Sequence, residues 1–293
     1  MDRDDANRLW ESQQRPNQPM IATQLIRSLD VSAASGLVWH DRSFWVVADD
    51  ENALFVFGRD GDSRRIPLLP GELPSAHADR KAVKPDFEVL CMLPGTGLLV
   101  MGSGSRVTRM QAVLVDHNES CFVIDTKPLC AALTTTFPAL NLEGATVLGD
   151  ELVLLQRGNR GDRRNALIFL ALEDLRQALA SRSFEVLRAP RVVVVDLGQQ
   201  GEIPWSCTDL TVLADGDLLV SAVLEDTGDA YQDGACLGSS LARLGADGAL
   251  RWHQRLDTAN KIEGIAVDGA NVWLVSDADD RNQPSQLLRA MLP

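Results

Sequence analysis

The clearest pattern in the chain is a five-fold recurrence of paired apolar strands. Each unit opens with a small or acidic residue, continues with a short apolar strand and a tight turn, and ends with a second apolar strand followed by charged or polar residues. The units recur roughly every 55 residues, a repeat length typical of β-propellers, in which each unit is one blade. The opening residues are Ser35, Glu88, Glu143, Thr208 and Glu263.

The hydrophobic pattern within the units predicts an all-β, five-bladed β-propeller with four-stranded antiparallel blades. The last unit ends one strand short, and the apolar segment 20–29 precedes the first unit without a place in it. We expect this N-terminal strand to complete the last blade, because such a clasp removes an exposed sheet edge. Residues 1–18 are expected to form an arm, and residues 19–293 a single propeller. The expected blades lie near 35–69, 88–127, 143–197, 208–255, and 263–293 with 20–29.

Three segments between the predicted strands have patterns of their own. Leu172, Leu175 and Leu179 are spaced as on one face of a helix, which predicts a short helix after the third strand of the third unit. A second short helix is expected around 129–133. The segment 70–86 contains three prolines and is long for a connection between blades, so we expect it to fold over one face of the propeller.

Composition narrows the class of protein. A hydrophobic content of 45% is enough for a core, and a net charge of −13 argues against a nucleic-acid partner. We expect no membrane association, because no apolar run approaches the roughly 20 residues of a membrane span. The five cysteines form no CxxC pair and indicate a reducing compartment. With a polar N-terminus, this predicts a cytoplasmic protein. The sequence identifies no protein partner.

The opening residues of the five units are expected to form a ring on the propeller axis, which we call the axial ring. Three glutamates close together repel one another, so the ring requires a bound cation, bound protons or neighbouring arginines. Oxygen donors without His or Cys suit Ca²⁺ better than zinc, so Ca²⁺ is the suspected cofactor. The alternative is a water-filled channel whose glutamates accept hydrogen bonds from backbone amides. The predicted metal ligands are Ser35, Glu88, Glu143, Thr208 and Glu263.

The register of the fourth unit leaves two candidates for the axial ring, Thr208 and Asp209. Alignment of the strand after Thr208 with that after Glu143 favours Thr208. A slip by one residue would exchange the inward and outward faces of the strand.

Charged and polar residues that follow the second strands should lie around the same mouth of the channel. Acidic side chains there are candidates for a general base. Arginines there are suited to bind phosphate or carboxylate, or else to pair with the acidic loops. The candidate catalytic residues are Asp49, Asp50, Glu225 and Asp226. The candidate substrate-binding residues are Ser105, Arg106, Arg157, Asn159 and Arg160.

Several stretches resemble an uncharacterised bacterial propeller family, among them ASGLVWHDRSFWVVADDENALFVF, KPDFEVLCMLPGTGLLVMGSGSR and NLEGATVLGDELVLLQRGNRGDRRNALI. This resemblance covers most of residues 30–290 and implies a propeller fold. The chain is also similar in style to phytase-like esterase domains. The order Ser, Glu, Glu, Thr, Glu in the axial ring resembles that of calcium-activated nucleotidases, which implies a central Ca²⁺ and near-axis loops that hold phosphates.

Three functions agree with these features. The first is a metal-dependent hydrolase of a small phosphorylated or otherwise anionic substrate, in which the ion polarises an oxygen and activates water. The second is a non-catalytic propeller with a structural Ca²⁺ and a face that binds a ligand or protein. The third is a hydrolase of the lactonase or esterase type.

Overall fold

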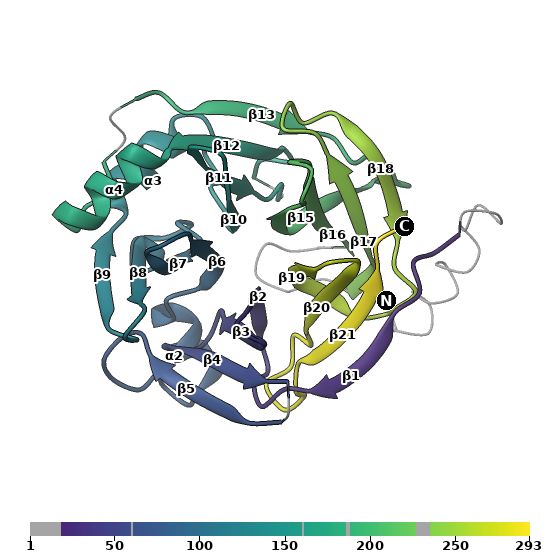
Figure 1. The fold of residues 1–293 in the computed structure, drawn as a ribbon, viewed down its shortest axis with the longest axis horizontal. Helices are drawn as coiled ribbons and strands as arrows, with labels where there is room; N and C mark the ends of the chain where they lie inside the picture. Colours follow the sequence, from purple (N-terminus) through teal and green to yellow (C-terminus); the bar gives the residue numbers. More distant parts are fainter. Residues whose placement is uncertain (1–18, 60, 160, 186–187, 227–234) are drawn as a thin grey trace.

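The predicted fold is confirmed by a computed structural model, which describes residues 19–59, 61–159, 161–185, 188–226 and 235–293. The strands form five antiparallel sheets arranged around a central axis (Figure 1). In each sheet the strand that opens the sequence unit lies nearest the axis, and the following strands lie progressively further out. The expected arm, residues 1–18, lies outside the described residues.

The first three blades each contain four strands in sequence order. The first consists of β2 (Ala34–His40), β3 (Ser43–Ala48), β4 (Ala53–Gly58) and β5 (Ser63–Pro67). The second consists of β6 (Phe87–Leu93), β7 (Gly97–Gly102), β8 (Gln111–Asp116) and β9 (Cys121–Asp125). The third consists of β10 (Leu142–Leu148), β11 (Glu151–Gln156), β12 (Asn165–Ala171) and β13 (Arg191–Val195).

The fourth blade carries an additional short strand. It consists of β14 (Gln199–Gln200), β15 (Ile203–Val212), β16 (Leu218–Asp226), β17 (Ala235–Leu244) and β18 (Leu250–Arg255). Its innermost strand β15 begins before Thr208, where we expected this blade to begin. Trp205 and Cys207 bury their side chains against blade three and pair with β16, which extends the strand beyond the repeat.

The fifth blade is closed by the N-terminus, as predicted. It consists of β19 (Lys261–Asp268), β20 (Asn271–Asp277), β21 (Gln286–Met291) and β1 (Gln24–Ser28). β1 pairs antiparallel with β21 at the outer edge (Figure 1). The backbone N–H of Leu29 donates to the carbonyl of Ser285 at 2.8 Å, which continues the pairing beyond the strand. The two ends of the described chain are therefore held in one sheet.

Helices occupy the three segments that the sequence singled out. The expected helix near Leu172 is α4 (Leu172–Ser181), and the one near 129–133 is α3 (Lys127–Thr134). The connection between blades one and two contains a short helix, α2 (His77–Val83), and a 3-10 turn, η1 (Val107–Arg109), follows β7. α3 and α4 contribute buried side chains to the packing between blades two and three.

The core is divided among the blade interfaces. In the described part of the chain, a separate cluster of buried apolar residues lies between each pair of neighbouring blades. Val46 and Val47 on β3 show how this arises, because successive side chains of a strand point to opposite faces. Val46 packs towards blade five and Val47 towards blade two, and both are fully buried. Because both faces of such a strand are buried, its sequence is a nearly continuous apolar run.

Candidate functional site: the acidic mouth of the axis

Each residue of the predicted axial ring occupies a β-bulge in the innermost strand of its blade. The strand pairing shifts register at one residue in β2, β6, β10, β15 and β19. A bulge inserts one extra, unpaired residue into a strand and interrupts the regular alternation of side chains between the two faces of the sheet. The five residues therefore occupy equivalent positions in their blades. The bulged residues are Ser35, Glu88, Glu143, Thr208 and Glu263.

The register of blade four is thereby defined. The bulge lies at Thr208, while the carboxylate of Asp209 accepts hydrogen bonds from the backbone N–H groups of Leu210 at 2.7 Å and Ile265 at 2.8 Å. Asp209 is buried, and its burial raises its pKa well above the ordinary value. Thr208 is thus the structural equivalent of Glu143.

The two hydroxyl members of the axial ring join neighbouring blades. Ser35 Oγ donates to the carbonyl of Phe87 at 2.5 Å, and Thr208 Oγ1 donates to the carbonyl of Ile262 at 2.8 Å. Both acceptors directly precede the ring residue of the next blade. The two hydroxyls therefore make equivalent inter-blade hydrogen bonds.

We expect Thr208→Val to lower the free energy of unfolding by about 1–3 kcal/mol, because it removes a fully buried hydroxyl from its acceptor. Urea unfolding followed by tryptophan fluorescence measures the loss. Thr211→Val is the matched control: Thr211 lies on the same strand and has no side-chain hydrogen bond within the described residues. Equal stability losses in the two variants would show that the inter-blade bond contributes nothing of its own.

Two glutamates of the axial ring, Glu143 and Glu263, contact protein cations. Arg157 lies between them, with Nη1 3.2 Å from Glu143 Oε2 and 3.5 Å from Glu263 Oε2. Its Nη2 lies 2.5 Å from Glu225 Oε2. Lys261 Nζ lies 3.0 Å from Glu225 and 3.2 Å from Glu263. We call these five residues the Arg157 network.

Burial and the two cations act in opposite directions on the pKa values of Glu143 and Glu225. Removal from water raises the pKa of Glu143 to about 8, even though Arg157 acts in the opposite direction. The pKa of Glu225 is lowered despite the opposing effect of burial, because Arg157 and Lys261 both attract its charge. Glu143 therefore carries a proton near neutral pH, whereas Glu225 is ionised. Glu225, a predicted catalytic residue, is a poor proton acceptor in this arrangement.

A separate acidic group lies between blades one and two. Asp49, Asp86 and Glu88 each place one carboxylate oxygen within 4.8 Å of those of the other two. Asp49 follows β3, Asp86 precedes β6, and Glu88 is the ring residue of β6. Glu88 is therefore the ring member that the structure brings into a group with the spacing of metal ligands.

Protein cations also contact this acidic group. Lys84 Nζ hydrogen-bonds Asp49 and lies 2.9 Å from Asp86 Oδ1. The other oxygen of Asp86 lies 2.8 Å from Arg109 Nη1 and accepts a hydrogen bond from Ser103 Oγ at 2.6 Å. Within the described residues, the Glu88 carboxylate has no such hydrogen bond or ion pair.

Two carboxyl groups of the acidic group, those of Asp49 and Glu88, have raised pKa values. Burial raises the pKa of Asp49 to about 6 against the attraction of Lys84. Burial and the neighbouring charges of Glu143 and Asp86 raise the pKa of Glu88 well above its usual value. The raised pKa suits the carboxyl group of Asp49 to proton transfer or to displacement of its proton by a cation.

The connection that contains α2 covers part of this mouth. Arg80, on α2, is buried, donates to the backbone carbonyl of Asp50, and lies 3.3 Å from Glu51 Oε1. Lys84 follows one helical turn later and reaches Asp49. Asp50, another predicted catalytic residue, also pairs with Arg281 at 3.1 Å. The expectation that segment 70–86 folds over one face agrees with these contacts.

Three more of the predicted site residues, Ser105, Arg106 and Asn159, lie in loops that follow the second strands of blades two and three. Ser105 Oγ bonds Ser103 Oγ at 2.8 Å and accepts from Arg109 at 3.0 Å, and Arg106 beside it is exposed. Asn159 holds its own loop, since its Nδ2 donates to the carbonyl of Ala139 at 3.1 Å. Two further predicted residues are not covered: Arg160 lies outside the described residues, and the side chain of Asp226 is not described.

Three charged residues of this mouth were missed by the sequence reasoning: Lys84, Asp86 and Lys261. Asp86 and Lys261 each lie two residues before a ring glutamate, as Asn141 does before Glu143. The recurrence of a charged or polar residue at this place in three units was an available signal. Lys84 lies in the connection rather than in the repeat, and no periodicity marks it.

Solved structures of low sequence identity share the fold. The glutaminyl cyclase of Myxococcus xanthus superposes with a TM-score of 0.52 at 12% identity, covering 94% of this chain and 100% of that one. A luciferin-regenerating enzyme superposes with a TM-score of 0.51 at 8% identity, covering 92% of this chain and 95% of that one. At these identities the likeness shows the propeller fold alone.

The chain was also compared with curated proteins and with models of protein families. No curated protein matches the chain. None of the helices in the described ranges combines the length and hydropathy required of a membrane-spanning segment. The model of a family of unknown function, DUF6929, matches residues 30–292, from just after β1 to just after β21. The chain therefore belongs to the DUF6929 family.

Proposed function

We propose that the acidic group of Asp49, Asp86 and Glu88 binds a divalent cation of the Ca²⁺ class, and that the protein hydrolyses a small phosphorylated or otherwise anionic substrate at this mouth. The supporting observation is the convergence of three carboxylates from two blades within 4.8 Å. The predicted set of five ring ligands is replaced in this proposal by one that shares only Glu88 with it.

The donor set fits such a cation. All three donors are carboxylates, with no His or Cys, which is the chemistry that Ca²⁺ and Mg²⁺ prefer. The ammonium of Lys84 contacts two of the three carboxylates and is a protein cation at the same place. A divalent cation would bind beside this ammonium or replace it.

The residues around the group have defined tasks in the proposal. A bound divalent cation would polarise a phosphoryl or carbonyl oxygen and acidify a water molecule. Asp49 would accept a proton from this water through the carboxylate oxygen that does not hold the cation. Arg106, exposed on the loop that Arg109 ties to Asp86, would anchor the anionic part of the substrate.

A second candidate is a non-catalytic propeller in which the cation is structural. The observation that favours it is the Arg157 network, in which Arg157 and Lys261 already engage Glu143, Glu225 and Glu263. A buried network of this kind stabilises a scaffold and leaves few donors for a substrate. A hydrolase of the lactonase or esterase type is a third candidate. The sequence resemblance to phytase-like esterase domains and to calcium-activated nucleotidases is also part of this proposal.

We expect EDTA-treated protein to bind Ca²⁺ in isothermal titration calorimetry, and Glu88→Gln to weaken this binding at least about tenfold by removing one anionic ligand. Glu151→Gln, in the exposed pair of blade three, is the control and should bind as the wild type does. Phosphate esters and sugar lactones are then assayed with Ca²⁺ or EDTA.

The outcomes separate the candidates. Turnover that requires Ca²⁺ and is lost in Glu88→Gln supports the hydrolase. Ca²⁺ binding that raises the melting temperature without turnover of any substrate supports the structural cation. Absence of Ca²⁺ binding to the wild type contradicts both.

The five free cysteines support a cytoplasmic location as a further part of this proposal.

A further inference from the structure

A cleft of about 670 Å³ opens at the seam between the first and last blades. Its walls come from β4 and β5 of blade one and from the segments 29–32 and 281–284, which flank β1 and β21 (Figure 1). This volume lies within the range of sites for small organic ligands. The cleft is distinct from the acidic group, which lies between blades one and two.

Two guanidinium groups on the cleft wall are held by fixed acceptors. Arg65 Nη2 lies 3.0 Å from Glu51 Oε2. Arg281 Nε lies 3.1 Å from Asp50 Oδ2, and its Nη1 donates to the carbonyl of Ser75 at 3.1 Å. These contacts leave N–H donors of both groups without a hydrogen bond in the described part of the chain. The donors are therefore oriented before any ligand arrives.

Three arginines line the cleft, and each is paired with a carboxylate. Arg64 pairs with Glu119, Arg65 with Glu51 and Arg281 with Asp50. A guanidinium group has five N–H donors, so one carboxylate partner does not occupy all of them. An anion would therefore be recognised by the remaining N–H donors rather than by an excess of positive charge.

Aromatic side chains form another part of the same wall. The rings of Phe55 and Phe57 are stacked, with centroids 6.4 Å apart and planes inclined by 8°. The guanidinium carbon of Arg65 lies 5.7 Å from the centroid of Phe55. Phe57 is buried beneath the wall, so the partly exposed ring of Phe55 supplies the apolar surface beside the guanidinium group of Arg65.

We propose that this cleft binds a small aromatic anion, a flat ring that carries a sulfonate, carboxylate or phosphate. The anionic group would accept hydrogen bonds from Arg65 and Arg281, since the guanidinium fork matches such oxyanions. The ring would pack against Phe55. This ligand site is independent of the cation and substrate proposed for the acidic group.

The test is calorimetric titration of the full chain with 2-naphthalenesulfonate. We expect one site per chain, with at least about tenfold weaker binding in Arg65→Gln, which loses a charged donor. Phe55→Leu should also weaken binding, because it keeps an apolar side chain and loses the aromatic face. Neutral 2-naphthalenemethanol and inorganic sulfate, which each supply half of the ligand, should both bind more weakly than 2-naphthalenesulfonate.

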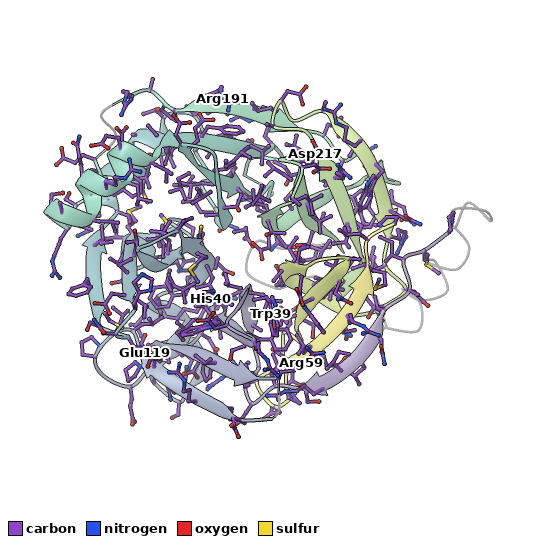
Figure 2. The ribbon with its side chains drawn as sticks, viewed as in Figure 1. Trp39, His40, Arg59, Glu119, Arg191 and Asp217 are labelled. Carbon is purple, nitrogen blue, oxygen red and sulfur yellow. The ribbon has the colours of Figure 1, made fainter. Side chains whose placement is uncertain are left out.

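Arg191→Gln is the matched control. Arg191 pairs with Glu151 at 2.9 Å and lies 3.4 Å over Phe169, which repeats the arrangement of Arg65 outside the cleft, on the outer strand of blade three (Figure 2). Unchanged binding in Arg191→Gln, with the melting temperatures of all variants preserved, supports the site. Absence of binding to the wild type, or equal affinities of the Arg65→Gln, Arg191→Gln and wild-type proteins, overturns the proposal.

Discussion

We expect Arg157→Met to lower the free energy of unfolding by about 3–5 kcal/mol, the cost typical of breaking a buried ion pair from one side. Arg157 contacts three buried or nearly buried glutamates, and its own side chain is 12% exposed. Its removal leaves Lys261 as the remaining cation of the Arg157 network. Equilibrium unfolding in urea at pH 7, followed by far-UV circular dichroism, measures the loss.

Two further variants show whether charge or packing is responsible. Arg157→Lys keeps the charge but lacks the planar fork that reaches several carboxylates, so we expect an intermediate loss. Arg191→Met removes an exposed arginine paired with Glu151, for which about 0–1 kcal/mol is typical. If Arg157→Met cost no more than Arg191→Met, the Arg157 network would not be a main source of stability.

The propeller could be predicted because each blade repeats the same hydrophobic pattern. The equivalence of the five opening residues could be predicted as well, since a bulge falls at the residue that opens each unit, including Thr208 in the least regular blade. The closing strand β1 followed from a missing partner in blade five. These features depend on backbone pairing and burial, which the order of apolar and polar residues encodes locally.

The partners of the ring carboxylates could not be predicted in the same way. The sequence showed three axial glutamates and several loop arginines. It did not show that one arginine, Arg157, would contact Glu143, Glu225 and Glu263 together. Such contacts depend on side-chain length and on the distance between blades. The role of Lys84 depends in addition on the path of a connection that has no repeat. Sequence reasoning therefore predicted where charges gather, and the structure was required to show which of them pair.

We expect the free energy of unfolding to fall as the pH rises from about 5 to about 8. The ordinary pKa of Glu143 is 4.5, and burial raises it to about 8 in the folded protein. Between these values the folded protein binds a proton that the unfolded chain has lost, so raising the pH favours unfolding. Below about pH 4.5, Glu143 is protonated in both the folded and the unfolded state, so its titration no longer changes the free energy of unfolding. One such proton contributes about 1.4 kcal/mol per pH unit at most, and Asp49, with a pKa of about 6, acts in the same direction in the lower part of the range.

Glu143→Gln should reduce this fall, because glutamine keeps a neutral side chain of similar shape at every pH. Urea unfolding at intervals between pH 5 and pH 8 measures the slope. Glu225→Gln is the control within the same network: the pKa of Glu225 is lowered by Arg157 and Lys261, so its titration lies below this range. Glu225→Gln should therefore lower stability at every pH in the range while leaving the slope as in the wild type. A Glu143→Gln protein with the wild-type slope would show that Glu143 is ionised in the folded state throughout this range.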